Sequence, residues 1–136
     1  LHLAAACGLS DRYLTKGSII VAQSHIDLHV LTESKPVTMA DISEEPTLQY
    51  REEAIKEGVR SIMVVPLDVR GTVIGVMRFY STQLRRFSDE AVSFAMAVAD
   101  LGVVSIENAK LHELLKQRLG SMKEDVDGWY RYLALS

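Results

Sequence analysis

The sequence predicts an α+β fold: a central antiparallel β-sheet with helices on both faces, followed by a long C-terminal helix. Three observations predict this fold. Two apolar segments rich in β-branched residues, 61–67 and 72–81, flank the link Arg70-Gly71, which suits a tight hairpin. Both faces of these segments are apolar, whereas a sheet with one solvated face alternates apolar and polar residues, so we expect cover on both faces. A helix start at Ser88 then opens a long stretch without proline.

The first third of the chain predicts short elements. Residues 1–6 are compatible with a short strand, and residues 19–21 with either a strand or a loop. From 24 to 33, apolar residues recur near helical spacing, which predicts a helix. Pro36 ends this helix, and residues 37–39 are expected to form a short strand.

A second helix is predicted after a polar loop at residues 41–45. Pro46 suits the first turn of a helix. Gly58 suits the left-handed position that follows a helix ending at Glu57. We therefore expect the helix to span 46–57 and to lead directly into the first strand of the hairpin.

The long C-terminal helix is expected to have two parts. Its first half carries apolar residues that can lie on the sheet. An apolar row with charged flanks then continues at steps of three or four residues: Leu111, Leu115, Leu119, Met122, Val126, Trp129 and Leu133. Such a row meets a partner helix more often than water, so we expect a homodimer through it. Gly120 and Gly128 weaken the helix, so a bend or an end is expected near one of them.

The composition is that of an ordinary globular domain and argues against several functions. The chain has 136 residues, 48% of them hydrophobic and 24% charged, and a formal net charge of −3. Nucleic-acid binding normally needs a basic stripe, so we expect no nucleic-acid partner. One cysteine, Cys7, excludes an internal disulfide and a cysteine zinc cluster. No apolar run approaches the roughly 20 residues of a membrane span and no signal peptide opens the chain, so we expect a cytoplasmic domain without membrane contact.

Six motifs occur along the chain: GLSDRY (8–13), KPVTMADI (35–42), QYREEAIKEGVRSIMVVPL (49–67), RGTVIGVMRFY (70–80), FSDE (87–90) and SIENAKLHE (105–113). Together they resemble the GAF domain, a small-molecule sensor module of bacterial signalling proteins and cyclic-nucleotide phosphodiesterases. The resemblance implies a GAF-like, PAS-related fold over residues 1–113 and a helical extension over residues 114–136. It also implies a sensory role in bacterial signal transduction.

The resemblance departs from the family at the N-terminus. The family begins with a helix and a strand that precede the segment starting here at Leu1. That strand lies inside the sheet, and the helix joins the dimer interface. The chain also starts without Met, so we expect it to belong to a longer protein. An upstream segment or a partner chain would supply the helix and strand, and the sequence leaves both open.

No enzymatic activity is expected. The family includes a methionine sulfoxide reductase, which works through several cysteines. Cys7 stands alone, and thiol–disulfide chemistry needs a second thiol within reach. We therefore expect Cys7 to be a small buried apolar residue.

Known cofactor classes of the family fit poorly. Relatives that bind cyclic nucleotides carry an Asn-Lys pair where this chain has Tyr80-Ser81. Bilin attachment would need a cysteine within residues 24–58, which contain none. Haem would need an axial histidine, and the spacing of His25 and His29 also suits a metal. No third ligand accompanies them, so we expect surface histidines, no metal site, and no haem.

A pocket for a small organic molecule is the remaining functional interpretation. In the family it lies between the sheet and the segment that here spans residues 24–58. The candidate lining residues are Ile26, Val30, Met39, Tyr50, Met63, Val65, Met77 and Phe79, with Arg78 and Tyr80 as weaker candidates on the alternate positions. The same residues suit a filled core equally well. Two functions therefore stay open: a ligand-binding sensor that signals through its C-terminal helix, and a structural homodimerisation domain without a ligand. The ligand, the output partner and any upstream domain stay unknown.

Overall fold

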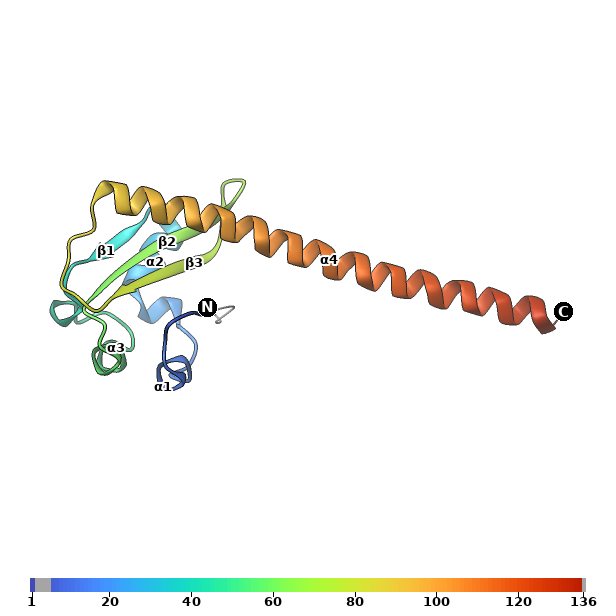
Figure 1. Ribbon diagram of the computed structural model, residues 1–136, viewed down its shortest axis with the longest axis horizontal. Coiled ribbons are helices and arrows are strands. Elements are labelled where there is room, and N and C mark those ends of the chain that lie inside the picture. The colour runs from blue at the N-terminus through green and yellow to red at the C-terminus, as the bar shows by residue number, and fades with distance from the viewer. Residues whose placement is uncertain (2–5, 136) are drawn as a thin grey trace. The chain divides into compact units, whose positions relative to one another are not determined.

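The computed structural model describes residue 1 and residues 6–135, with side chains described up to residue 123. The chain divides into two compact units, Leu1–Leu101 and Gly102–Ser136. The first unit holds the sheet, the shorter helices and the start of the long C-terminal helix (Figure 1). Within the second unit, the described residues form a single helix.

The sheet of the described residues has three antiparallel strands in the order β1-β2-β3. They are β1 (Val37–Met39), β2 (Ser61–Val69) and β3 (Thr72–Ser81). All three predicted strands in this part of the chain are confirmed, and β2 extends two residues beyond its predicted end. Registers such as Val37 opposite Val64 and Met63 opposite Phe79 place apolar residues of neighbouring strands side by side.

The hairpin between β2 and β3 forms at the predicted link. Arg70 and Gly71 both have positive φ, 51° and 85°. Positive φ at both positions is typical of the two-residue hairpin turn whose twist matches that of the flanking strands. The Gly71 N–H donates to the Asp68 carboxylate at 2.7 Å. A register shift between Leu67 and Asp68 marks a bulge just before the turn.

The helices are α1 (Asp11–Leu14), α2 (His25–Glu33), α3 (Arg51–Glu57) and α4 (Asp89–Leu135), with 3₁₀ turns η1 (Val21–Gln23) and η2 (Ile42–Glu44). The prediction of α2 is confirmed. The predicted start of α3 at Pro46 is wrong. Thr47 instead donates from its N–H to the Glu45 carboxylate at 3.3 Å, and Tyr50 adopts a left-handed φ of 61°. This local turn competes with helical hydrogen bonding, so the helix begins at Arg51.

The N-terminal prediction is tested only in part. Residues 2–5 of the expected strand lie outside the described residues. Leu1 and Ile19 exchange two backbone hydrogen bonds of 2.8 and 3.1 Å. The sequence left residues 19–21 open as a strand or a loop. They form no regular strand, and Val21 begins the 3₁₀ turn η1.

Helix α4 begins as predicted and continues to Leu135. The Ala91 N–H donates to the Ser88 hydroxyl at 3.1 Å, the expected N-cap hydrogen bond. The helix passes Gly120 and Gly128 without ending, so an end at either glycine is wrong. The expected boundary between residues 113 and 114 falls inside this helix. Among the described residues, no helix is both long and apolar enough to cross a membrane.

Two apolar clusters cover the two faces of the sheet. One contains Ile26 and Val30 of α2 with Ile62 and Val64 of β2. The other contains Ala95 and Ala99 of α4 with Met63 and Val65 of β2. Figure 1 shows α2 on one face and the first turns of α4 on the other. The predicted α+β fold, with helices on both faces of an antiparallel sheet, is confirmed.

Candidate functional site

The strands divide the predicted pocket residues between two faces. Met63, Val65, Met77 and Phe79 pack with α4. They therefore cannot face residues 24–58, and their assignment to that side of the sheet is wrong. The physical reason is that successive strand residues point to opposite faces, and both sets here are apolar. Hydrophobicity alone could not decide which set faces which helix.

The face toward α2 carries the residues that the sequence ranked lower. Val76 and Tyr80 pack against the cluster formed with α2, and Arg78 pairs with Asp27 of this helix. Of the other predicted residues, Ile26 and Val30 belong to this cluster and Met39 packs against it. Tyr50 lies beside the loop at Gly17, and its hydroxyl donates to the Ser18 carbonyl at 3.0 Å.

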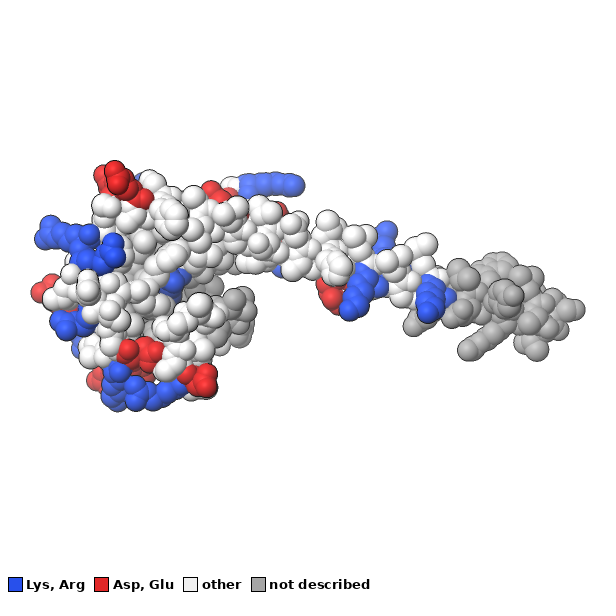
Figure 2. Space-filling view, viewed as in Figure 1, with Lys and Arg blue, Asp and Glu red and all other residues white. Residues whose placement is uncertain are grey.

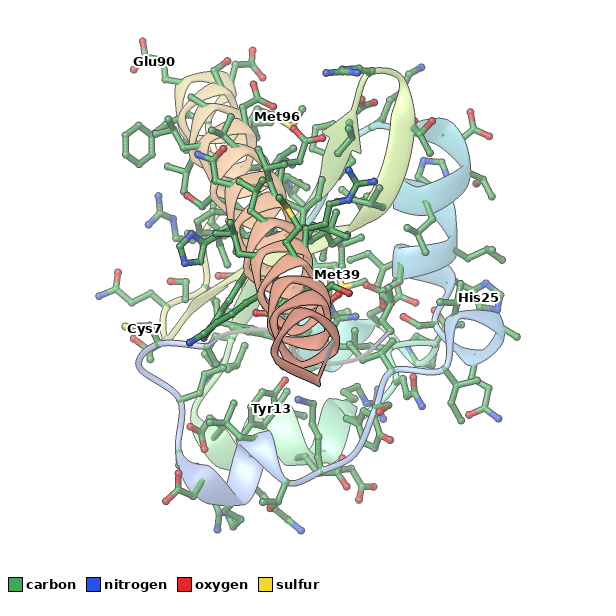
Figure 3. The ribbon with its side chains drawn as sticks, turned by 90° about the vertical axis from the view of Figure 1, so that its right-hand side faces the viewer. Cys7, Tyr13, His25, Met39, Glu90 and Met96 are labelled. Atoms are coloured by element: carbon green, nitrogen blue, oxygen red, sulfur yellow. The ribbon has the colours of Figure 1, made fainter. Side chains whose placement is uncertain are left out.

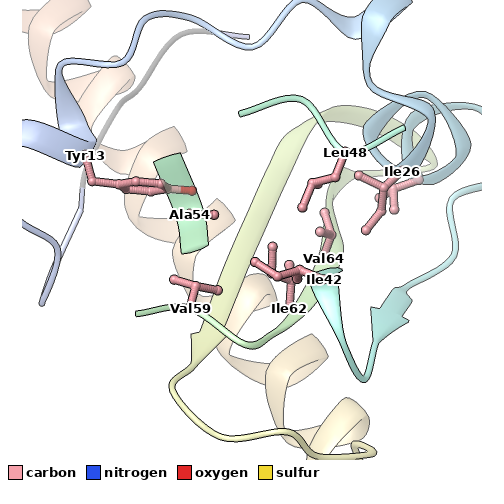
Figure 4. Close-up of a cluster of buried hydrophobic side chains, with 9 residues drawn as sticks. Tyr13, Ile26, Ile42, Leu48, Ala54, Val59, Ile62 and Val64 are labelled. Carbon is pink, nitrogen blue, oxygen red and sulfur yellow. The ribbon is translucent and has the colours of Figure 1, made fainter. Parts of the chain in front are cut away.

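The space between the sheet and residues 24–58 is filled by apolar side chains. Figure 4 shows Ile42, Leu48, Ile62 and Val64 gathered there. Val30 and Val64 are 0% exposed. At these positions the side chains form a packed core, and a ligand needs another place.

A buried ion pair joins α2 to β3 across this core. Asp27 is 0% exposed and the Arg78 side chain 9%. Arg78 donates from Nε to Asp27 Oδ1 at 3.2 Å and from Nη2 to Oδ2, which also accepts from the Ser24 hydroxyl. Burial alone would lower the pKa of the Arg78 guanidinium, but Asp27 and Tyr80 outweigh it and raise this pKa above its ordinary value. The Arg78 guanidinium therefore stays charged, and its donors are satisfied by the Asp27 carboxylate.

Sequence reasoning missed Asp27 and Ser24 and underrated Arg78. The available signal was an arginine inside an apolar strand, because a buried charge requires a partner of opposite sign. An aspartate between the buried positions Ile26 and Val30 of one helix was the matching signal. The two residues are 51 positions apart, so local spacing could not pair them.

An aromatic group lies next to this pair. The rings of Tyr13 and Tyr80 meet edge to face, with centroids 5.8 Å apart. Lys16 Nζ lies 3.9 Å from the Tyr13 ring centroid. Burial is the main cause that raises the pKa of Tyr13, with a further contribution from Tyr80. Burial also lowers the pKa of Lys16. Both shifts follow from removing water around charged forms.

A surface hollow of about 320 Å³ lies at one end of the sheet. Residues 24–58 contribute one wall, and residues next to the strand ends contribute the other. The lining residues are Ile42, Ser43, Ile55, Gly58, Val59, Arg60 and Thr82. Apolar walls with a few polar groups, in a volume of this order, suit a small organic molecule.

Cysteine and histidine chemistry does not converge at this site. Cys7 is exposed, so its predicted burial is wrong; it precedes Gly8, in a segment outside any helix or strand. His25 and His29 are exposed on α2, as expected. Figure 3 shows Cys7 and His25 at opposite sides of the molecule. Within the described part of the chain, no group of three or more His, Cys, Asp or Glu could hold a metal ion.

Comparison by sequence finds one family. The profile described as GAF domain matches residues 5–107. No curated protein matches the chain.

Comparison by structure finds similar folds. A domain of a protein described as a two-component sensor histidine kinase from Sinorhizobium meliloti has a TM-score of 0.65 at 22% identity, covering 83% of this chain and 73% of that one. The GAF domain of a phosphoenolpyruvate-protein phosphotransferase from Coxiella burnetii has a TM-score of 0.65 at 21% identity, covering 78% and 62%. A type II free methionine-R-sulfoxide reductase from Thermoplasma acidophilum has a TM-score of 0.52 at 24% identity, covering 62% and 57%.

Proposed function

Since this chain belongs to the GAF domain family, we propose that it is a non-catalytic sensory domain in bacterial signal transduction. It binds a small molecule in the hollow at the end of the sheet, where residues 24–58 form one wall, and signals through α4. The similarity to a domain of a sensor histidine kinase supports the sensory role. The single cysteine supports the absence of thiol–disulfide catalysis, which needs a second thiol. A cytoplasmic location fits this role.

The observation that carries the proposal is the hollow beside Thr82. Its walls come from residues 24–58 on one side and from the strand ends on the other. Thr82 directly follows β3 and opens the segment 82–88 that leads into α4. The Ser61 hydroxyl holds this segment by donating to the Gln83 carbonyl at 2.6 Å. A ligand in the hollow would therefore touch the connection to α4 directly.

Strand β3 offers a second route for the signal. Arg78 is bonded to Asp27 on one face of the sheet, while its chain neighbours Met77 and Phe79 pack with α4 on the other. A shift of β3 therefore changes contacts on both faces at once. A ligand shifts such an equilibrium only by the difference between its affinities for the two arrangements.

The output is a second copy of the chain bound along α4. Leu111, Leu115, Leu119 and Met122 are all exposed. The side chains of Val126 and Trp129 lie outside the described part, so their share of the row stays a prediction. Figure 2 shows uncharged side chains over much of the described part of this helix, with charged ones in small separate groups.

Asn108 indicates how two copies would align. Val104, Asn108, Leu111 and Leu115 follow one another at steps of four, three and four residues, and all are exposed. A single asparagine in such an apolar row fixes register and favours two parallel chains. The same row supports the second candidate function, a structural homodimerisation domain without a ligand.

Native mass spectrometry of the purified chain, followed by a thermal-shift panel of metabolites, tests the ligand. A bound compound should raise the melting temperature, and Ile55→Arg should abolish this shift by filling the hollow. Leu28→Arg is the matched control, because Leu28 is 43% exposed, Ile55 is 45% exposed, and Leu28 does not line the hollow. A shift that survives Ile55→Arg would contradict binding in the hollow. No bound compound and no shift would favour the structural function.

Light scattering tests the dimer. The full chain should be a dimer, and a chain ending at His112 should be a monomer. Leu115→Glu should also weaken the dimer, whereas Gln117→Glu adds the same charge outside the apolar row and should not. An unchanged dimer after truncation would refute this interface.

A further inference from the structure

We propose that the hollow beside Thr82 is specific for short aliphatic carboxylates, with Arg60 binding the carboxylate group and Ile55 covering part of the hydrocarbon chain. The inference rests on the proposed ligand-binding function of this hollow and adds the chemical class of the ligand. Two properties of the lining carry it: its charged side chain is an arginine, and most of its other side chains are apolar.

Arg60 supplies the charge among the described residues that line the hollow. Its side chain is exposed, and within the described part of the chain its guanidinium has no hydrogen-bond or ion-pair partner. A guanidinium presents its N–H donors in a planar fork that matches the two oxygens of a carboxylate. A carboxylate in the hollow would therefore meet a free partner of the right charge and shape.

The backbone of Arg60 is held between the two walls of the hollow. Its N–H donates to the Ser81 carbonyl at 2.8 Å, and its carbonyl accepts from the Ile42 N–H at 2.9 Å. Ile42 begins η2 on one wall, and Ser81 ends β3 directly before Thr82 on the other. The Arg60 side chain therefore starts from a fixed point, which limits the ordering that a bound ligand would require.

The Asp41 carboxylate acts on Arg60, but it is already bonded to Ser43. Asp41 Oδ1 accepts from the Ser43 hydroxyl at 2.7 Å and from the Ser43 N–H at 3.0 Å. These hydrogen bonds are the main cause that lowers the pKa of Asp41, and Arg60 adds a smaller electrostatic contribution. A second guanidinium, that of Arg51, donates from Nη1 to the Ser43 carbonyl at 3.2 Å. Asp41 alone therefore does not cancel the positive charge beside Ser43.

The apolar part of the lining suits a hydrocarbon chain. Ile42 and Val59 are 1% and 3% exposed and belong to the packed cluster, so this wall is fixed. Ile55 is 45% exposed although its side chain is large and apolar, and a hydrocarbon chain would remove part of it from water. The volume of about 320 Å³ equals that of roughly ten water molecules in the liquid, so the chain must be short.

NMR or calorimetric titration with hexanoate, 1-hexanol, hexylammonium and acetate, at constant ionic strength, tests the proposal. Hexanoate should bind saturably and at least about fivefold more tightly than hexanol or hexylammonium, which carry the same chain without the negative charge. Acetate, which has the charge without the chain, should bind at least about tenfold more weakly than hexanoate. Arg60→Gln should reduce hexanoate binding to the level of hexanol. Arg70→Gln is the matched control, because Arg70 is also exposed but lies at the other end of β2, and it should leave the preference unchanged.

Equal binding of hexanoate and hexanol, no saturable binding of hexanoate, or a preference that survives Arg60→Gln would each overturn the inference. If Arg60→Gln does not fold, Arg60→Lys decides, because it keeps the charge without the planar fork. A reduced preference in Arg60→Lys would support the inference, and an unchanged preference would overturn it. The proposed function is decided separately: hexanol binding, or a metabolite-induced thermal shift, that is lost in Ile55→Arg would keep the hollow as a ligand site even if the carboxylate class is wrong.

Discussion

Replacing Asp27 with asparagine should destabilise the fold more than any other single change of charge on α2. Asp27 is 0% exposed, and its two carboxylate oxygens bind Arg78 and Ser24. The neutral amide leaves the Arg78 guanidinium, itself 9% exposed, without its counter-charge. Removing one member of a buried pair costs about 3–5 kcal/mol in the free energy of unfolding. At this chain length the melting temperature should fall by roughly 10–20 °C.

Urea unfolding followed by near-ultraviolet circular dichroism measures this loss, and a paired substitution tests its cause. Asp27→Leu with Arg78→Met replaces the ion pair by apolar groups, an exchange that is often neutral or stabilising. The Ser24 hydroxyl then loses its acceptor, which costs about 1–3 kcal/mol. The double variant should therefore lie within about 2 kcal/mol of the wild type. A loss below about 1 kcal/mol for Asp27→Asn, or a double variant as unstable as the sum of the two single ones, would refute the reasoning.

Two further predictions concern α1 and the contact between the sheet and α4. The hydrogen bonds from Ser10 lower the pKa of Glu57 below its ordinary value of 4.5, so their stabilisation is present above that pH and is lost as the pH falls through the lowered pKa. NMR resonances of α1 should shift in this acid range in the wild type and not in Glu57→Gln; identical titrations would contradict the role of Glu57. Ala99→Leu, at a position 0% exposed against the sheet, should cost about 1–3 kcal/mol in chemical denaturation. Ala97→Leu, on the exposed side of the same helix, should change stability little, and equal losses in both variants would show that the packing argument is wrong.

Local signals were sufficient for most of the fold. The β-branched runs and the Arg70-Gly71 link predicted the hairpin, because both turn residues needed positive φ and the strands needed stiff side chains. The helix His25–Glu33 followed from apolar spacing. The start of α3 failed because a turn around Thr47 competes with the helix, and the proline signal at Pro46 does not report that competition.

The candidate site was less predictable because it depends on contacts distant in sequence. The hollow is assembled from η2, α3 and residues beside two strands, and no single motif carries its shape. The Asp27–Arg78 pair forms across 51 residues. The sequence could have indicated that a charge in an apolar strand needs a partner, but several carboxylates were available to it.

The wrong face assignment explains how this sheet can couple two surfaces. Alternation along β3 sends Arg78 and Tyr80 toward α2 and sends Met77 and Phe79 toward α4. Both sets are partly buried, so hydrophobicity could not distinguish them. A displacement of Arg78 along its bonds to Asp27 therefore also changes the packing of Met77 and Phe79 against Ala95 and Ala99. The two faces of β3 would move independently only if one of them were polar and hydrated. The face of β3 on which α4 packs is apolar.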